Sequence, residues 1–140
     1  MELRIICFED SSRDQQRLET VFAKHNAQIL FFGDPPNDWT ISQRQAEQIS
    51  AFDPHLAIVD LRDDKSRAEA GLRVIRKLRE HQLTSGIPII VWSVWLDDSP
   101  RGQRFIGLVR EGGATPLLKS KKRLPRASKF LSAANIDMNP

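Results

Sequence analysis

Four apolar runs in this sequence each end in polar side chains that can take part in metal or phosphate chemistry. The first run ends at Glu9 and Asp10, another at Asp60, and two later runs end at Ser93 and Lys119. Carboxylates held a few ångströms apart raise one another's proton affinity, so they need a nearby cation to stay ionised. Three carboxylates, a hydroxyl and an ammonium at one place would therefore suit a divalent metal ion and a phosphoryl group.

Each of these residues alone also has a more ordinary interpretation. Asp10 and Asp60 suit the N-caps of helices, and Ser93 suits a turn. Lys119 suits the first residue of a solvated tail. Only their convergence favours the chemical interpretation, so the elements that carry them decide the question.

Apolar runs of strand length alternate with segments of helical period along the chain. The predicted strands are residues 3–8, 29–32, 55–60, 89–93 and 114–118. This pattern predicts an α/β fold, a doubly wound sheet of five parallel strands in the order 2-1-3-4-5, inside a three-layer sandwich. Ligands of such sheets bind at the carboxyl ends of the strands, near the point where the winding reverses. All the polar residues named above fall at that edge.

Short motifs predict where the helices begin. Ser12 with Gln15, and Thr40 with Gln43, have the spacing of a capping box. Ser99 precedes a proline, which predicts an N-cap followed by proline at the first helical position. A short last helix is expected after residue 125.

Composition limits the class of protein. The chain has 140 residues, 40% of them hydrophobic, and one cysteine, so we expect one domain without an intramolecular disulfide. No apolar stretch approaches the roughly 20 residues that span a bilayer, and the N-terminus lacks the features of a secretory signal. We therefore expect a cytoplasmic protein without a membrane span.

The charge is unevenly distributed along the chain. From residue 119 onward there are 6 basic residues and 1 acidic residue, whereas residues 1–118 hold 15 basic and 17 acidic residues. A basic tail can attract nucleic acid, an anionic membrane surface or an acidic partner. The tail carries few aromatic residues and no base-reading motif, so we interpret it as a solvated segment and do not expect direct binding to nucleic acid.

Taken together, the chain resembles the receiver domain of bacterial two-component response regulators, of the single-domain chemotaxis type. The resemblance covers residues 1–119 and rests on four segments: Glu9-Asp10, HLAIVDLR around Asp60, IPIIVWS ending at Ser93, and EGGATPLLKS around Lys119. It implies a flavodoxin-like fold. It also implies a receiver domain at residues 1–120, followed by a basic C-terminal segment at 121–140.

The resemblance implies that the protein takes part in a phosphorelay. It would catalyse its own phosphorylation and dephosphorylation and would not act as a conventional enzyme. Asp60 would accept a phosphoryl group from a sensor histidine kinase or a phosphotransfer protein and later lose it, while Lys119 and Ser93 contact that group. Signalling would follow through a downstream protein partner, with the chain as a monomer or weak dimer. The cofactor implied is Mg²⁺, a hard cation that prefers oxygen ligands. Its implied ligands are Glu9, Asp10, Asp60 and the backbone carbonyl of Arg62.

Three positions differ from the usual family pattern and keep alternatives open. Pro116 stands where an aromatic residue usually moves on activation, Val94 where the residue is usually small, and Ser120 where proline usually follows the lysine. One alternative is a pseudo-receiver, a protein-interaction module without productive phosphorylation. Another is the receiver part of a longer transcriptional regulator.

Overall fold

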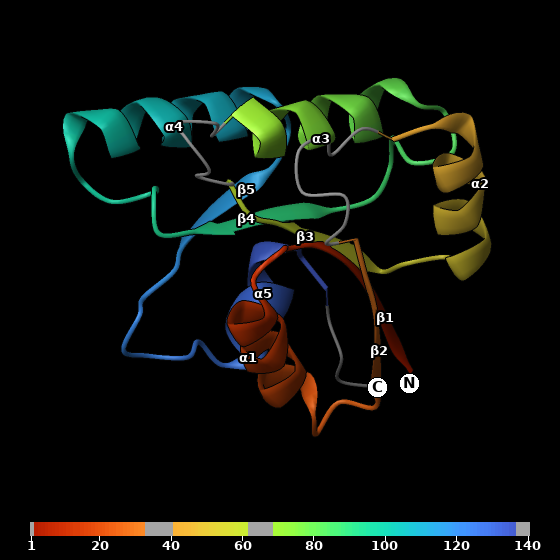
Figure 1. The fold of residues 1–140 in the computed structure, drawn as a ribbon, viewed down its shortest axis with the longest axis horizontal. Helices are drawn as coiled ribbons and strands as arrows, with labels where there is room; N and C mark the ends of the chain where they lie inside the picture. Colours follow the sequence, from red (N-terminus) through yellow and green to blue (C-terminus); the bar gives the residue numbers. More distant parts are fainter. Residues whose placement is uncertain (1, 33–40, 62–68, 137–140) are drawn as a thin grey trace.

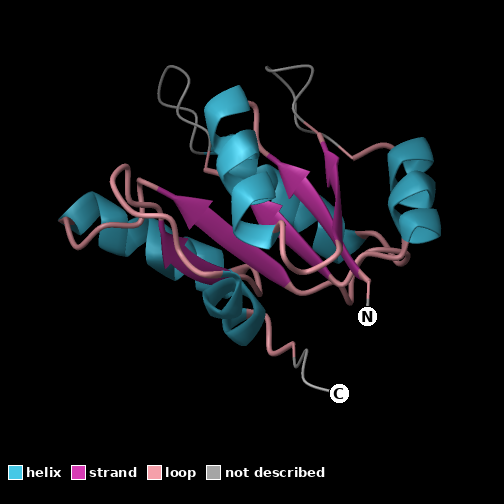
Figure 2. Ribbon diagram, turned by 90° about the horizontal axis from the view of Figure 1, so that it is seen from below, coloured by secondary structure: helices cyan, strands magenta, loops and turns pink. Residues whose placement is uncertain are grey.

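The computed structural model describes residues 2–32, 41–61 and 69–136, in which strands and helices alternate. The strands pair in parallel in the order β2-β1-β3-β4-β5, as predicted. Figure 2 shows the strands side by side and running in the same general direction. Their bounds are β1 (Leu3–Phe8), β2 (Ala27–Phe31), β3 (Leu56–Val59), β4 (Ile89–Ser93) and β5 (Thr115–Leu118).

Helices cover both faces of the sheet (Figure 1). One face carries α2 (Gln43–Phe52), α3 (Glu69–Glu80) and α4 (Pro100–Glu111), and the other carries α1 (Ser12–Phe22) and α5 (Ala127–Ala133). Side chains of a strand alternate between the two faces. In β1, Ile6 and Phe8 join the core beneath α2, α3 and α4, whereas Ile5 and Cys7 join the core beneath α1 and α5. The predicted three-layer sandwich is confirmed.

The start of α1 differs from the prediction. Its N-cap is Ser11, whose hydroxyl accepts a hydrogen bond from the backbone N–H of Asp14. Gln15 turns back to donate to the carbonyl of Glu9 at 2.7 Å. The predicted capping box of Ser12 and Gln15 is therefore wrong, because Ser12 already lies inside the helix. This arrangement ties the first turn of α1 to the end of β1.

The other helix starts are partly as predicted. In α2 the capping box is formed by Ser42 and Gln45, not by the predicted Thr40 and Gln43, because Gln43 is the first helical residue. Thr40 lies outside the described residues. The predicted N-cap at Ser99 is confirmed, since its hydroxyl accepts from the backbone of α4 and proline follows.

The predicted last helix is present as α5. Its buried residues Phe130 and Leu131 pack beside α1, and the Phe130 ring lies 5.5 Å from that of Phe22 and 5.7 Å from that of Trp92. The division of the chain at residue 120 stays a prediction. In the part of the chain that the structure describes, no helix has the length and apolar character needed to cross a membrane.

Candidate functional site

The structure brings the predicted site residues to one edge of the sheet. Phe8 of β1 and Val59 of β3 are paired, so the residues that follow them, Glu9 and Asp60, leave adjacent strands side by side. On the other side of β3, the backbone N–H of Lys119 donates to the carbonyl of Ser93 at 2.9 Å. Side chains that are up to 110 positions apart in sequence therefore lie together at this edge of the sheet.

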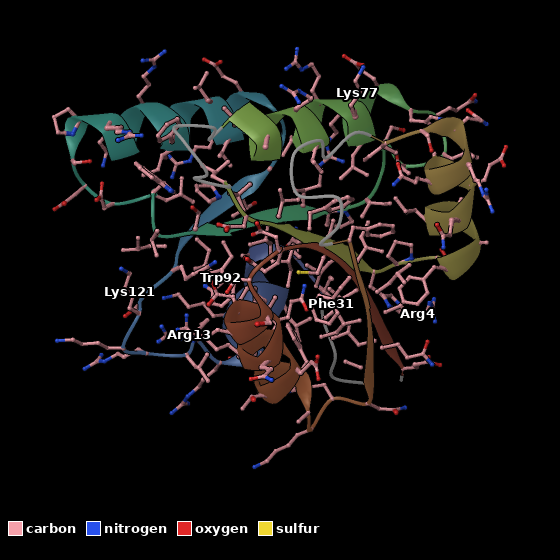
Figure 3. The ribbon with its side chains drawn as sticks, viewed as in Figure 1. Arg4, Arg13, Phe31, Lys77, Trp92 and Lys121 are labelled. Atoms are coloured by element: carbon pink, nitrogen blue, oxygen red, sulfur yellow. The ribbon has the colours of Figure 1, made fainter. Side chains whose placement is uncertain are left out.

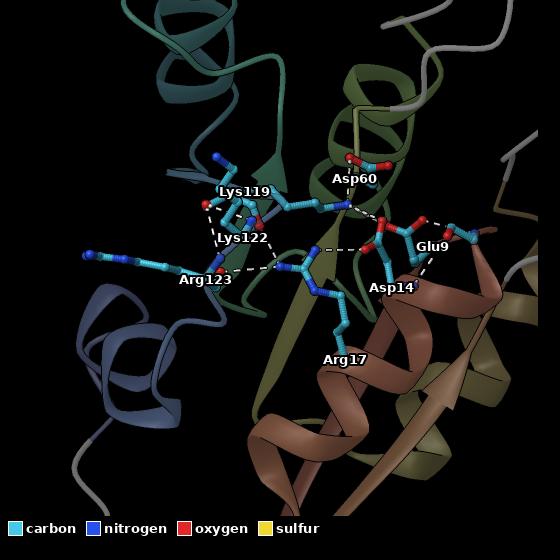
Figure 4. Close-up of polar contacts among 9 residues, drawn as sticks. Glu9, Asp14, Arg17, Asp60, Lys119, Lys122 and Arg123 are labelled. Carbon is cyan, nitrogen blue, oxygen red and sulfur yellow. Dashed lines mark hydrogen bonds and ion pairs between the residues drawn. The ribbon is translucent and has the colours of Figure 1, made fainter.

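The Lys119 ammonium is the centre of this edge (Figure 4). Its Nζ lies 3.0 Å from Glu9 Oε2, 3.0 Å from Asp14 Oδ2 and 3.5 Å from Asp60 Oδ1. The Lys119 side chain is only 4% exposed and that of Glu9 only 2%. Because charges are expensive to bury unless they are paired, the ammonium and the carboxylates depend on one another. Removing the cation would leave buried negative charge unpaired.

Asp14 is a site residue that was not predicted from the sequence. This residue lies in the first turn of α1, and its Oδ1 also accepts a hydrogen bond from Arg17 Nη1 at 3.0 Å. The available signal was an acidic residue at the start of a helix whose N-terminus points at the site. Such residues are common for electrostatic reasons alone, so the signal was weak.

Three carboxylates form a candidate cation site. One oxygen from each of Glu9, Asp10 and Asp60 lies within 4.8 Å of the others, with Glu9 buried and Asp10 exposed. An all-oxygen set of this kind fits Mg²⁺ or another hard divalent ion. The fourth predicted ligand, the carbonyl of Arg62, lies outside the described residues.

Burial and neighbouring charges change the acid–base behaviour of the site. Burial raises the pKa of Glu9 to about 8, and the Asp60 carboxylate adds to the rise, against the opposing effect of Lys119. Burial also raises the pKa of Asp60, although Lys119 and a hydrogen bond with Ser93 work against it. For Lys119, burial lowers the pKa, but the surrounding carboxylates outweigh burial and raise it overall. Lys119 therefore stays cationic, whereas Glu9 and Asp60 hold their protons more tightly than free carboxyl groups do.

A pocket of about 440 Å³ opens beside Asp60. Val94, whose exposed fraction is 38%, and Trp95 form part of its wall, and Ser93 is fully buried behind them. Arg13 and Lys121 also line the pocket, and Figure 3 shows both on the α1 side of the molecule. A cationic lining around an acidic floor suits a small anion that reaches a carboxylate.

Gly71 is a second feature that the sequence analysis did not identify. A Cβ on this residue of α3 would overlap with the backbone carbonyl oxygen of Asp60 and would crowd Leu61. Glycine therefore allows α3 to pack directly against the end of β3. Nothing in the local sequence pattern marks this approach, because it depends on how helix and strand meet in space.

Pro116, which the sequence analysis noted as unusual, lies in β5 and pairs with Val91. The strand is at the edge of the sheet, where proline is tolerated because only one side of the strand needs its backbone donors.

Comparison by sequence identifies no relative. No protein-family model matches the chain, and no curated protein sequence matches it.

Comparison by structure finds many solved neighbours. The Vibrio cholerae chemotaxis protein CheY4 superposes with a TM-score of 0.67 at 14% identity, over 94% of this chain and 98% of that chain. A putative response regulator from Chloroflexus aurantiacus gives a TM-score of 0.67 at 18% identity, over 96% of this chain and 99% of the other.

A third neighbour is the receiver domain of a sensor histidine kinase from Pseudomonas aeruginosa, with a TM-score of 0.65 at 14% identity. The match covers 96% of this chain and 99% of that domain, whose structure has a magnesium ion coordinated in the active site cleft. Across nearly its whole length, the chain therefore has the flavodoxin-like fold of response-regulator receiver domains, with an acidic cluster at the edge of the sheet.

Proposed function

We propose that the chain is a phosphoaccepting receiver in which Asp60 takes a phosphoryl group in a Mg²⁺-dependent reaction. The main support for the proposal is that the buried Lys119 ammonium contacts both Asp60 and Glu9. Lys119 Nζ lies 3.5 Å from Asp60 Oδ1 and also touches Glu9, which belongs to the three-carboxylate cluster. A nucleophilic carboxylate, a fixed cation and a set of metal-binding oxygens are the parts that phosphoryl transfer to a carboxylate needs.

In this reaction a carboxylate oxygen of Asp60 forms the new bond to phosphorus. The bond between phosphorus and the donor atom breaks, and its electron pair leaves with the donor. Negative charge is then spread over the phosphoryl oxygens, within reach of Lys119 and beside the buried Ser93 hydroxyl. Hydrolysis of the resulting acyl phosphate returns Asp60 to its starting form.

The proposed metal site consists of Glu9, Asp10 and Asp60, with the carbonyl of Arg62 as the predicted fourth protein ligand. A bound Mg²⁺ would supply positive charge that neutralises the phosphoryl oxygens. The protein's own contribution is to hold these carboxylates together before the ion arrives. Burial raises the pKa values of Glu9 and Asp60, so additional positive charge beside them would favour their ionised forms.

The proposed donor is a sensor histidine kinase or a phosphotransfer protein, and the proposed output is contact with a downstream protein. A second candidate function, a pseudo-receiver that only binds partners, is favoured by two observations. Val94 and Trp95 line the pocket beside Asp60, and Pro116 occupies the β5 position where receiver domains usually have a movable aromatic side chain.

Intact mass measurement after incubation with acetyl phosphate and Mg²⁺ distinguishes the two functions. The phosphoaccepting receiver gains one phosphoryl group that hydroxylamine removes, and the Asp60→Asn variant gains none. Asp98→Asn, which alters an exposed acid on the loop before α4, is the matched control and gains the group normally. The absence of any gain in the unaltered protein, with this donor and with a cognate kinase, would favour the pseudo-receiver.

A further inference from the structure

The Asp14 carboxylate connects the site lysine to a second cation. Its Oδ2 accepts from Lys119 Nζ and its Oδ1 accepts from Arg17 Nη1, both at 3.0 Å (Figure 4). The Arg17 side chain is 13% exposed and that of Asp14 18%, so neither ion pair is a fully solvated surface contact. The two oxygens of the Asp14 carboxylate therefore link Arg17 of α1 to Lys119 at the end of β5.

Arg17 holds the chain that follows Lys119 as well. Its Nη2 donates to the backbone carbonyl of Ser120 and, at 3.3 Å, to that of Arg123. The segment between these carbonyls is closed by the Ser120 hydroxyl, which accepts from the backbone N–H groups of Lys122 and Arg123, each at 3.2 Å. One guanidinium thus fixes both ends of a turn that begins directly after the site lysine.

The Lys119 ammonium and the Arg17 guanidinium both lie over the ring of Trp92. Lys119 Nζ lies 4.5 Å and the Arg17 guanidinium carbon 5.3 Å from the centre of the buried Trp92 ring. Cations at such distances are attracted to the ring face. Lys119 is therefore confined by the ring, by carboxylates and by the anchored turn, and Asp14 and Arg17 supply two of these restraints.

We propose that Asp14 and Arg17 are a pair of positioning residues that hold the Lys119 ammonium toward Asp60 for phosphoryl transfer. Neither residue takes part in bond making. Arg17 acts by fixing the Asp14 carboxylate and the Ser120–Arg123 turn, and Asp14 acts by fixing Lys119 Nζ. The assignment rests on the proposed function, since the reaction is what the positioning serves.

Charge stabilisation in phosphoryl transfer depends on donors that are already in place when the reaction begins. A flexible lysine would have to be ordered in each turnover, and its charge would be shared with water for part of the time. Loss of either residue of the pair should therefore lower the rate constant at saturating donor more than it changes the donor concentration needed for half-maximal rate.

The test uses the full chain and the variants Asp14→Asn, Arg17→Gln and the double variant. The matched controls are Glu19→Gln, an exposed acid on α1, and Arg104→Gln, an exposed arginine on α4. Two readouts are compared: single-turnover phosphorylation by acetyl phosphate with Mg²⁺, and acylation of lysines by acetic anhydride, mapped by mass spectrometry. Circular dichroism confirms that each variant is folded, and Arg17→Lys replaces Arg17→Gln if the latter does not fold.

The proposal predicts a rate constant about tenfold lower in each single variant, which corresponds to about 1.4 kcal/mol in the barrier. Acylation of the buried Lys119 should rise severalfold while that of the exposed Lys77 stays unchanged. Because the two residues act through each other, the double variant should lose less than the product of the two single losses. Both controls should behave like the unaltered protein.

Unchanged acylation of Lys119 in both single variants would overturn the proposal, as would rate losses that multiply in the double variant. The acylation readout does not require the reaction. If no protein is phosphorylated, the proposed function fails while Lys119 acylation still shows whether the pair holds the lysine. If phosphorylation proceeds normally in both variants, the pair is structural only and this inference fails while the proposed function stands.

Discussion

The two halves of the candidate site differ in how they are built. The ends of β1 and β3 carry the acidic half, Glu9, Asp10 and Asp60, whose oxygens lie close enough to share one cation. The ends of β4 and β5 carry the other half, in which Ser93 and Lys119 are buried and bulky groups surround them. The acidic half has the oxygen ligands that a hard cation prefers, whereas residues of the other half line the pocket beside Asp60.

The two halves of the site are joined by direct contacts. The carboxylates of the acidic half are held at short distance by a lysine that belongs to the other half. In the proposed reaction, metal binding and access to Asp60 would therefore be coupled through Lys119.

Replacing Lys119 should damage the acidic half most strongly. Lys119→Met removes an ammonium whose side chain is 4% exposed, which leaves the largely buried Asp14 and Asp60 carboxylates without this partner. The free energy of unfolding at pH 7 without metal should fall by about 3–5 kcal/mol, the usual loss for a broken buried pair. Urea unfolding followed by circular dichroism measures it.

The control for that experiment is Lys77→Met on α3. Lys77 is 46% exposed and pairs with Glu80 at 3.7 Å, so the change should be below about 1 kcal/mol. Millimolar Mg²⁺ should restore part of the stability that Lys119→Met loses, because it brings positive charge back to the carboxylates. Equal stability of the two variants would show that the halves are not coupled through Lys119.

Gly71→Ala should displace α3 or the end of β3, which carries Asp60. The new methyl group would overlap with the Asp60 carbonyl, so α3 or the end of β3 must move, and overpacking of this kind costs about 1–3 kcal/mol. Gly107→Ala on α4 is the matched control, since no atom lies within 4 Å of its added Cβ. Thermal unfolding should show a loss for the first variant and a small gain for the second, through helix propensity. A neutral Gly71→Ala would argue against direct packing of α3 on Asp60.

Magnesium affinity should depend on pH through the acidic half alone. Since the pKa of Glu9 is raised from 4.5 to about 8, Glu9 holds a proton in the metal-free protein at neutral pH. A carboxyl group must lose this proton to bind the ion, so affinity should rise with pH and level off above about pH 8. Below that value the slope should approach roughly tenfold per pH unit, the limit for one released proton.

Isothermal titration calorimetry at pH 6.5, 7.5 and 9 measures this slope. Asp60 has a pKa shifted in the same direction and contributes with the same sign. Glu9→Gln should bind Mg²⁺ more weakly and with a flatter pH dependence. Affinity that is constant from pH 6.5 to pH 9 would contradict the acid–base behaviour assigned to Glu9.

Val94→Ala should act on the other half and have the smallest effect. Val94 is 38% exposed and lines the pocket, so its truncation widens access to Asp60 with little loss of packing. We expect phosphorylation by acetyl phosphate to become about threefold faster, equivalent to about 0.6 kcal/mol in the barrier. Stability and Mg²⁺ affinity should stay unchanged. A slower variant would mean that Val94 helps to orient the donor.

Much of the fold was predictable because the three central strands, β1, β3 and β4, are buried on both faces. In the run that ends at Asp60, continuous apolar residues are required by packing, so the pattern identifies the strand and its carboxyl end. Helix starts were less predictable. Ser11, Ser12 and Ser42 are all acceptable caps by residue type, and tertiary packing decides which one is used.

The site was predictable where a residue ends a strand and unpredictable where two elements meet. Glu9 and Lys119 follow strands, and the parallel topology alone brings them to one edge. Asp14 and Arg17 lie on a helix, and the Lys119 and Ser120 groups that they contact are more than 100 residues away in sequence. Gly71 also matters only because of the backbone that it faces. No local pattern contains that information.

The central claim is that Asp60 is the phosphoryl acceptor. It is tested most directly by incubating the full chain with acetyl phosphate and Mg²⁺, reducing the product with borohydride, and locating the reduced residue by peptide mass. Borohydride converts an acyl phosphate to an alcohol and leaves free carboxylates unchanged. We expect reduction at Asp60 in the tryptic peptide that ends at Arg62, and none when Mg²⁺ is chelated. Reduction at another acidic residue such as Asp14, or at none, would contradict it.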